Sequence, residues 1–278
     1  MKQIKYIDDN ELKYKKNVLD GLQAYNNTQT GVKEFHIKHY YILDEDRLVG
    51  AFSGILAWDW IYFGDLFYQN PYVLKSMINH LSKNYMDKAV GMMYYTFVKE
   101  RKDDFIDCGF HVKSTLPNMP KGQTTSFLYN TEYEYLNIKQ SFKILEFDEI
   151  NKDYNEILKE EVELYKKQHN ISVKKIELEF VALDDDQFVG GVYGYIELDY
   201  LYVNLLYVDE SYRGHRIATK LMDLIEEEAI NKGLENVFLG TCDFQAYDFY
   251  VKRNYTLHAT VKDLPKGFNE YTFVKKLI

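Results

Sequence analysis

The stretch that decides the fold runs from Val208 to Leu221 and reads VDESYRGHRIATKL. An apolar run leads here into a basic, glycine-containing turn, and the turn opens a helical pattern. The first turn of a helix leaves backbone N–H groups unpaired at the positive end of the helix dipole, which favours anion binding. Arg213 and Arg216 add two guanidinium groups to the same turn. The stretch therefore predicts a cradle for a pyrophosphate group, with an ordinary basic turn as the alternative.

The residues on both sides of this cradle predict a fixed order of strands and helices. Upstream, residues 181–192 read as a hairpin around an acidic turn, and residues 200–208 are rich in β-branched and aromatic side chains. Downstream, apolar residues recur at helical spacing from Ile217 until Lys232-Gly233 ends the helix. A strand over 237–240 and a short helix over 244–250 follow.

This order, together with Arg213-Gly214-His215-Arg216-Ile217-Ala218, resembles the GNAT superfamily of acyl-CoA-dependent N-acetyltransferases, and the resemblance covers nearly all of residues 140–278. The family signature is Arg or Gln, two residues, Gly, any residue, then Gly or Ala. Arg216 stands where glycine is usual, so we expect the backbone to lie farther from the phosphates while the guanidinium compensates in part. The resemblance implies an α/β fold, a mostly antiparallel twisted sheet flanked by helices.

The resemblance also implies acetyl-CoA as the co-substrate. The residues expected to bind it are Leu206, Tyr207 and Val208 on the strand, Arg213, Gly214, His215, Arg216, Ile217, Ala218 and Thr219 in the cradle, and Asp243 beyond it. In the family, the strand backbone pairs with the pantetheine arm where the strand splays from its neighbour. Asp243 stands where many relatives carry an asparagine, and an ionised Asp cannot donate, which puts that contact in doubt.

The mechanism implied by the resemblance is direct attack of an amine on the thioester carbonyl. Tyr250 stands where family members carry the tyrosine that protonates the leaving thiol, and a phenol is protonated at neutral pH. An aromatic with a packing role is the alternative reading of Tyr250. No general base is marked: Glu197, Asp199 or a water chain are the candidates, and ordinary solvated acids are the alternative. His215 would lie in the phosphate loop, too far from the chemistry.

An internal repeat predicts that the domain occurs twice. Residues 43–51 match residues 183–191 at an offset of 140, and the match resumes at about 144. The later pairs are 88–94 with 232–238, Asp104-Phe105 with Asp248-Phe249, Gly109-Phe110 with Asn254-Tyr255, and Pro120-Lys121-Gly122 with Pro265-Lys266-Gly267. A single elongated domain with chance similarity is the alternative.

The repeat divides the chain at a polar segment, residues 131–141. We expect a degenerate GNAT-like domain over 1–130, this linker, and a GNAT acetyltransferase domain over 142–278. The first copy has Gln69–Leu74 in place of the cradle, and Ile106 or a neighbour in place of Tyr250. We expect Ile4-Lys5-Tyr6 and a helix over 10–25 to open the first domain. The segments 142–145 and 154–168 should open the second in the same way.

Length and composition exclude several classes of protein. The 278 residues allow one large or two modest domains, and a net charge of −9 argues against nucleic-acid binding. The absence of a long apolar run and the polar start Met1-Lys2-Gln3 predict a cytoplasmic, soluble protein without membrane association. Cys108 and Cys242 have neither metal nor disulfide spacing, so we expect no metal and structural thiols, with chemistry at Cys242 left open.

The expected function is acetyl-CoA-dependent N-acetylation of a primary amine on a small molecule by the second domain. A non-catalytic acyl-CoA sensor or scaffold is the main alternative, and two purely structural halves are the least favoured one. The aromatic run that includes Trp58, Trp60, Tyr62 and Phe63 is expected to pack the sheet, with a ligand cleft or burial against the second copy as alternatives. The identity of the amine and a homodimeric assembly are left open.

Overall fold

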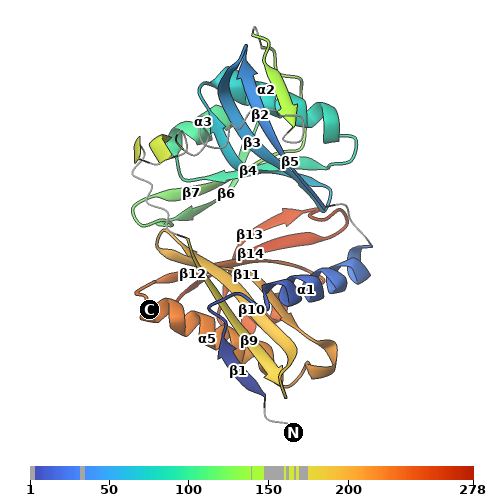
Figure 1. The fold of residues 1–278 in the computed structure, drawn as a ribbon, viewed down its shortest axis with the longest axis vertical. Coiled ribbons are helices and arrows are strands. Elements are labelled where there is room, and N and C mark those ends of the chain that lie inside the picture. Colours follow the sequence, from blue (N-terminus) through green and yellow to red (C-terminus); the bar gives the residue numbers. More distant parts are fainter. Residues whose placement is uncertain are drawn as a thin grey trace.

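The computed structural model describes residues 4–31, 35–138, 140–146, 160, 163–165, 167–168 and 175–278. In this part of the chain the strands form two seven-stranded sheets, which lie one above the other in Figure 1. We name them the amino-terminal sheet and the carboxyl-terminal sheet, after the half of the sequence that supplies most of their strands. Each carries its own buried apolar core against its helices.

The carboxyl-terminal sheet is mostly antiparallel, and only β11 and β12 run parallel. In spatial order its strands are β1 (Lys5–Asp8), β9 (Ile176–Asp184), β10 (Gln187–Glu197), β11 (Tyr200–Val208), β12 (Asn236–Cys242), β14 (Asn269–Lys276) and β13 (Thr256–Lys262). The helices beside it are α1 (Lys15–Thr30), α5 (Ile217–Asn231) and α6 (Tyr247–Lys252).

The amino-terminal sheet repeats this arrangement strand for strand, with its single parallel pair between β4 and β5. In the matching order its strands are β8 (Lys143–Glu146), β2 (Phe35–Asp44), β3 (Arg47–Ala57), β4 (Trp60–Tyr68), β5 (Gly91–Thr96), β7 (Thr124–Asn130) and β6 (His111–Pro117). Helices α2 (Pro71–Tyr85) and α3 (Lys99–Ile106) accompany it. The predicted mixed α/β fold is confirmed, and both halves of the sequence repeat have the same topology.

The first strand of each half lies in the sheet of the other half. Strand β1 pairs with β9, with Lys5 opposite Leu183, whereas β8 pairs with β2, with Lys143 opposite Leu43. Helix α1 follows β1 and packs on β11, where a Cβ on Gly21 would meet the Tyr207 ring at 2.6 Å. The prediction that Ile4–Tyr6 and the helix over 10–25 open the first sheet is therefore wrong.

The physical reason for this exchange is that both sheets present the same kind of edge. A short edge-strand pattern marks which residues pair, but two homologous sheets offer it equivalent partners. Strands cross the seam at 131–141 in both directions, so the sheets do not divide there. Most of the helix predicted over 154–168 lies outside the described residues; Leu164 and Tyr165 are helical.

Sheet register also corrects the offset of the repeat by one residue. Gly91 lies opposite Trp60 in the amino-terminal sheet, and Asn236 lies opposite Tyr200 in the carboxyl-terminal sheet. Since Trp60 and Tyr200 are 140 residues apart, Gly91 corresponds to Asn236 at an offset of 145. The predicted match of 88–94 with 232–238 is therefore displaced by one position.

The two halves contact each other through two equivalent turns, one from each half. Both turns contain a cis proline, at Met119–Pro120 and Leu264–Pro265, and both are closed by a side chain that accepts from a glycine N–H. Each contacts the opposite half: Trp60 Nε1 donates to the Asp263 carbonyl at 2.8 Å, and the Lys121 N–H donates to Asp199 Oδ2 at 2.6 Å. The halves thus meet through an approximately two-fold arrangement.

A buried carboxyl group marks the place where β1 joins β9. Glu179 on β9 is fully buried, and among the described residues no donor with hydrogen-bond geometry reaches either of its oxygens. Desolvation, followed by the neighbouring Asp9 carboxyl, raises the pKa of Glu179 from its ordinary 4.5 to about 8. The folded protein therefore holds a proton on Glu179 at neutral pH, beside the exchanged strand.

This raised pKa predicts that stability falls as pH rises. The folded state binds the proton more tightly than the unfolded state, so the stabilisation is complete below pH 4.5 and is lost as pH rises through about 8. The Glu179→Gln variant should lack this pH dependence. Its free energy of unfolding, relative to that of the wild type, should therefore increase from pH 6 to pH 9. Urea unfolding at both pH values measures the difference. An unchanged pH slope in the variant would show that Glu179 ionises normally.

Candidate active site

The site begins where β11 and β12 part. Their parallel pairing covers only Tyr200–Val203 and Asn236–Leu239. At the next residue, Asn204, a bulge shifts the pairing of β11 with β10. Leu206 and Val208 on one strand and Gly240 on the other therefore lie beyond the last paired residues. The predicted splay is confirmed, and it leaves strand edges whose backbone groups can pair with an extended ligand.

The turn after β11 presents unpaired backbone amides to solvent. Asp209 Oδ1 accepts the Ser211 N–H at 2.9 Å and fixes a short 3₁₀ turn over Glu210–Tyr212. Gly214 and Arg216 then adopt positive φ values of 81° and 61°, and α5 begins at Ile217 without a side-chain cap. The first backbone bond into the helix is from the Lys220 N–H to the Arg216 carbonyl. The amides of the first helical turn are thus available to an anion.

The predicted cradle residues lie together in this turn. Arg213, Gly214, His215 and Arg216 are exposed, Ile217 is buried in the core, and Ala218 and Thr219 are half-buried. Arg213 Nε donates to the Val208 carbonyl at 3.2 Å, which ties the turn to the end of β11. Its guanidinium lies 4.9 Å from the centroid of the Tyr25 ring on α1. The exchanged helix therefore borders the cradle.

The left-handed backbone at Arg216 explains why family members carry glycine at this position. A residue with a Cβ loses about 1–2 kcal/mol in that conformation, and glycine does not. Arg216 therefore has a strained backbone conformation, and its guanidinium places a cation beside the cradle. The expected compensation by charge stays a prediction.

The corresponding turn of the amino-terminal sheet is closed. Asn70 caps α2, because its Oδ1 accepts the N–H groups of Tyr72 at 3.0 Å and Val73 at 3.3 Å. Pro71 has no N–H to offer, and this turn carries no arginine. The absence of a cradle, predicted from the sequence, therefore has a structural counterpart: the helix amides are already satisfied.

The first half also lacks the hydroxyl of Tyr250. The Phe110 N–H donates to the Phe105 carbonyl as the Tyr255 N–H donates to the Tyr250 carbonyl, both at 3.1 Å. The counterpart of Tyr250 is therefore Phe105, the residue before Ile106. Its ring stacks on Tyr94 of β5 at 4.2 Å and meets Phe63 of β4 at 5.3 Å. Aromatic rings thus fill the space between the diverging strands.

Tyr250 lies on α6 behind the parting of β11 and β12. It is 5% exposed, and its ring packs on Tyr255 and Phe273. Burial raises the pKa of Tyr250, and the nearby Arg253 opposes this in part. Tyr250 is also close enough to Tyr202 on β11 to raise the pKa of Tyr202, behind the larger effects of burial and Glu270. The Tyr250 phenol is therefore protonated at neutral pH.

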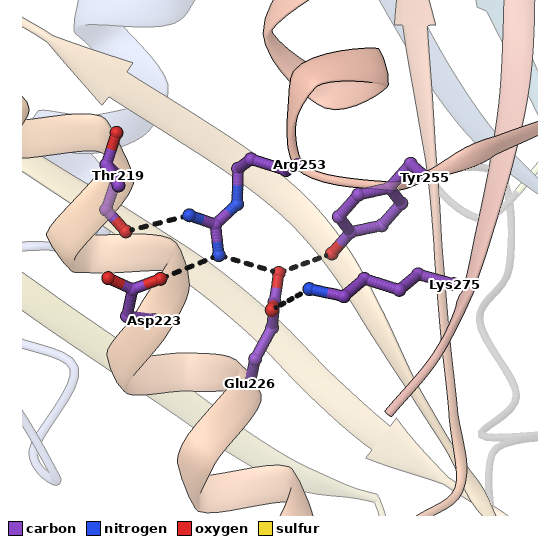
Figure 2. A network of polar contacts seen from close by, with 6 residues as sticks. All are labelled: Thr219, Asp223, Glu226, Arg253, Tyr255 and Lys275. Atoms are coloured by element: carbon purple, nitrogen blue, oxygen red, sulfur yellow. Dashed lines mark hydrogen bonds and ion pairs between the residues drawn. The ribbon is translucent and has the colours of Figure 1, made fainter. Parts of the chain in front are cut away.

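A buried ion-pair network fixes α6 against the cradle helix, as Figure 2 shows. Arg253, just after α6, donates to the Thr219 carbonyl at 3.3 Å and to Asp223 at 2.9 Å on α5. Glu226 receives Arg253 at 3.1 Å, Lys275 at 2.6 Å and the Tyr255 hydroxyl at 2.8 Å. Tyr250 and the first turn of α5 are thereby held in one rigid unit.

Two hydrogen bonds connect α1 to the segment that precedes α6. The Tyr25 hydroxyl donates to the Phe244 carbonyl at 2.7 Å, and Gln245 Nε2 donates to Asn26 Oδ1 at 2.8 Å. Tyr25 was not predicted at this site, because its helix was expected to pack on the other sheet. The resemblance also implies that the segments 26–33 and 169–174 form part of the amine pocket. Asn26 opens the first of these segments, and the second lies outside the described residues.

Asp243 is occupied in a turn. Its Oδ2 accepts the Asn269 N–H at 2.9 Å, and its own N–H donates to the Asn269 carbonyl at 3.0 Å. The carboxylate thus joins β12 to β14 at the end of the site. Its contact with pantetheine stays a prediction.

The candidate bases and thiols are also placed. Asp199 binds the Lys121 N–H, and the Glu197 charge, behind burial, raises the pKa of Tyr95 to about 12. Cys108 and Cys242 are buried and free, and burial raises the pKa of both thiols.

Among the described residues no group of three or more His, Cys, Asp or Glu is arranged to hold a metal. None of the helices described is long and apolar enough to span a membrane.

Comparisons with known proteins agree with this geometry. Residues 144–255 match the model of the acetyltransferase (GNAT) family. A blasticidin-S acetyltransferase of Streptomyces morookaense is 34% identical over 92 residues, which are 33% of this chain and 68% of that protein. An acetyltransferase of Agrobacterium fabrum is 34% identical over 84 residues, or 30% of this chain and 61% of that protein. A solved acetyltransferase from Bacillus cereus shares 29% identity over 46% of this chain and 96% of its own, with a TM-score of 0.41.

The chain therefore belongs to the acetyltransferase (GNAT) family. The enzyme class predicted from the sequence, an acetyltransferase, is confirmed, and members of this family use acetyl-CoA. The matched segment begins inside β8, which pairs in the amino-terminal sheet, so the family pattern crosses the exchange.

Two substitutions at Arg216 separate backbone strain from charge. Arg216→Gly should raise the free energy of unfolding by up to about 1 kcal/mol, since glycine accepts the positive φ, whereas Arg216→Ala should not. Both remove the guanidinium, so both should weaken CoA binding to a similar extent, and less so at high salt. Urea unfolding and calorimetry measure the two effects. Equal stability of the two variants would show that the turn is unstrained.

Proposed function

We propose that the chain transfers the acetyl group of acetyl-CoA to a primary amine of a small molecule, at the parting of β11 and β12. The observation that carries the proposal is the uncapped first turn of α5, with exposed Arg213 and Arg216, at the end of an unpaired strand edge. The matching turn of the amino-terminal sheet is capped, so this anion site occurs once in the described chain.

The residues of the site have different roles in the proposed reaction. The cradle amides and the two arginines bind the pyrophosphate, and the backbone of Leu206–Val208 orients the pantetheine arm. This alignment converts the attack of the amine into an intramolecular-like step. The neutral amine nitrogen forms a bond to the thioester carbonyl carbon and loses a proton to solvent, and the carbon–sulfur bond breaks. The leaving sulfur takes the proton of the Tyr250 hydroxyl, which is then restored from solvent.

Burial suits Tyr250 to this role. Because burial raises its pKa, the hydroxyl keeps its proton until a thiolate develops beside it. The structure shows no competing hydrogen-bond acceptor for this hydroxyl among the described residues. Phe105, at the equivalent place in the first half, has no proton to give.

The two halves differ in that the first turn of α5 is uncapped and that of α2 is capped, and this difference also indicates how the whole chain is organised. We propose a degenerate GNAT-like copy over 1–130 and an active copy over 142–278, which exchange β1, α1 and β8 across the segment 131–141. A cytoplasmic location and the absence of nucleic-acid partners stay proposals that rest on the net charge of −9. The name of the Streptomyces relative suggests amine-bearing antibiotics as first candidates for the acceptor.

Replacement of Tyr250 tests the proposal. We expect Tyr250→Phe to lower kcat by about 100-fold while acetyl-CoA binds as before, since general acid catalysis contributes roughly 10²–10⁴. Release of CoA thiol is measured with a panel of primary amines that includes blasticidin S, spermidine and tyramine.

The matched control is Tyr247→Phe, on the same helix, which should retain the wild-type rate. Full activity of Tyr250→Phe would contradict the role of the hydroxyl. Binding of acetyl-CoA without amine-dependent release from the wild type would favour a sensor instead.

A further inference from the structure

A carboxylate lies at the parting of the strands without any assigned role. Glu270 on β14 pairs in register with Cys242 on β12. Its Oε1 lies 3.0 Å from the position that a Cβ on Gly240 would occupy, so the absence of a side chain there makes room for it. Gly240 is the first residue of β12 beyond the pairing with β11. The carboxylate therefore stands over the point where the thioester is expected.

Glu270 faces side chains from both sheets. Tyr62 on β4 and Tyr129 on β7 pack in one apolar cluster with Leu264 of the carboxyl-terminal half. The thiol of Cys242, the residue opposite Glu270, donates to the Leu264 carbonyl at 3.7 Å. Tyr202 on β11 and Cys242 on β12 approach it from its own sheet. Burial is the main cause of the raised pKa of all four groups, and the Glu270 charge is the next. The carboxylate thus lies near the place where the two sheets meet.

No cation neutralises this carboxylate. Within the described residues Glu270 has neither an ion-pair partner nor a hydrogen-bond donor. Protein surrounds it, yet the residue keeps part of its surface open, and desolvation raises its pKa to about 7. Glu226, by contrast, is buried with Arg253, Lys275 and Tyr255 as partners. Buried carboxylates that serve the fold are normally paired in this way.

We propose that Glu270 binds the ammonium group of the acceptor and takes its proton, and that Tyr62 and Tyr129 form the acceptor side of the site. The inference rests on the proposed function and specifies its substrate as a small molecule with a primary ammonium group. Tyrosine rings beside a carboxylate suit such a cation. The ammonium gives one proton to Glu270, and the neutral nitrogen attacks the thioester carbonyl carbon. The carbon–sulfur bond breaks as the sulfur takes the proton of Tyr250, and the nitrogen releases its second proton to solvent, from which the Tyr250 hydroxyl is restored. Glu270 returns its proton to solvent.

In this proposal the acid, Tyr250, and the base, Glu270, lie at different positions. Tyr250 packs on Phe273 of β14, and Glu270, three residues before Phe273 on the same strand, points to the opposite face of the sheet. The earlier candidates are less well placed, because Asp199 is engaged by Lys121 and Glu197 acts on Tyr95, Tyr195 and Tyr200 instead. The first half, without a cofactor cradle, then has a function: it supplies a wall of the acceptor site.

The kinetic test compares Glu270→Gln with Glu197→Gln. With whichever amine of the panel the wild type turns over, we expect kcat/KM to rise through a pKa near 7. Glu270→Gln should lose that limb and lower kcat by about 100-fold, while acetyl-CoA binding measured by calorimetry stays the same. Glu197→Gln should keep the limb. An active wild type whose rate and pH profile survive Glu270→Gln would overturn the role of Glu270 and leave the proposed function intact.

A second measurement does not depend on turnover. Carboxyl carbon-13 NMR of glutamate-labelled protein should show one group that titrates near pH 7 and disappears in Glu270→Gln. Spermidine or tyramine, with CoA bound, should lower that pKa, since a cation favours the carboxylate. Titration of Glu270 at an ordinary value near 4.5, or no response to either amine, would overturn the inference.

Tyr62→Ala tests the contribution of the amino-terminal sheet. We expect KM for the amine to rise by about 10-fold with little change in acetyl-CoA affinity, because the ring borders only the acceptor. An unchanged KM would show that the first half takes no part in the site. If no amine releases CoA from the wild type, the proposed function fails, and the NMR titration still decides whether Glu270 binds a cation.

Discussion

The structure depends on a single loss of pairing, at the point where β11 and β12 separate after Val203 and Leu239. A parallel pair inside a sheet normally satisfies its backbone groups along its length. Here the two strands part at a bulge, and the edges that result need a ligand or a side chain to cover them. The cradle, Tyr250 and Glu270 are all arranged around this opening. Each would be an ordinary residue elsewhere in the fold.

The two sheets show two ways to cover the same opening. In the amino-terminal sheet, rings of Phe63, Tyr94 and Phe105 pack into it, and Asn70 satisfies the helix amides. In the carboxyl-terminal sheet the helix amides remain uncapped, and a phenol replaces the Phe105 ring. The exchange of β1 and α1 makes the halves inseparable (Figure 1), because Tyr25 and Asn26 of the first half complete the second site. Under the proposed function, the silent copy is therefore a structural part of the active one.

Much of this was predictable from the sequence, because local patterns carry it. The order of elements after residue 176 and the repeat follow from residue types at fixed spacing, and the splay follows from the resemblance to the family. The exchange was not predictable, since β1 and β8 have the same edge-strand pattern and two homologous sheets to pair with. Glu270 was missed because an acid on a terminal strand reads as a solvated residue. Only the packing of the two sheets desolvates this carboxylate and raises its pKa.

The central claim, one thioester site per chain, is tested most directly by calorimetric titration of acetyl-CoA into the pure protein, with Arg213→Glu as the control. We expect a stoichiometry of one, and loss of binding in the control, because the guanidinium beside Val208 would become a carboxylate facing the pyrophosphate. Two sites per chain, or full binding by Arg213→Glu, would contradict the assignment of an open cradle to the second half and a closed one to the first.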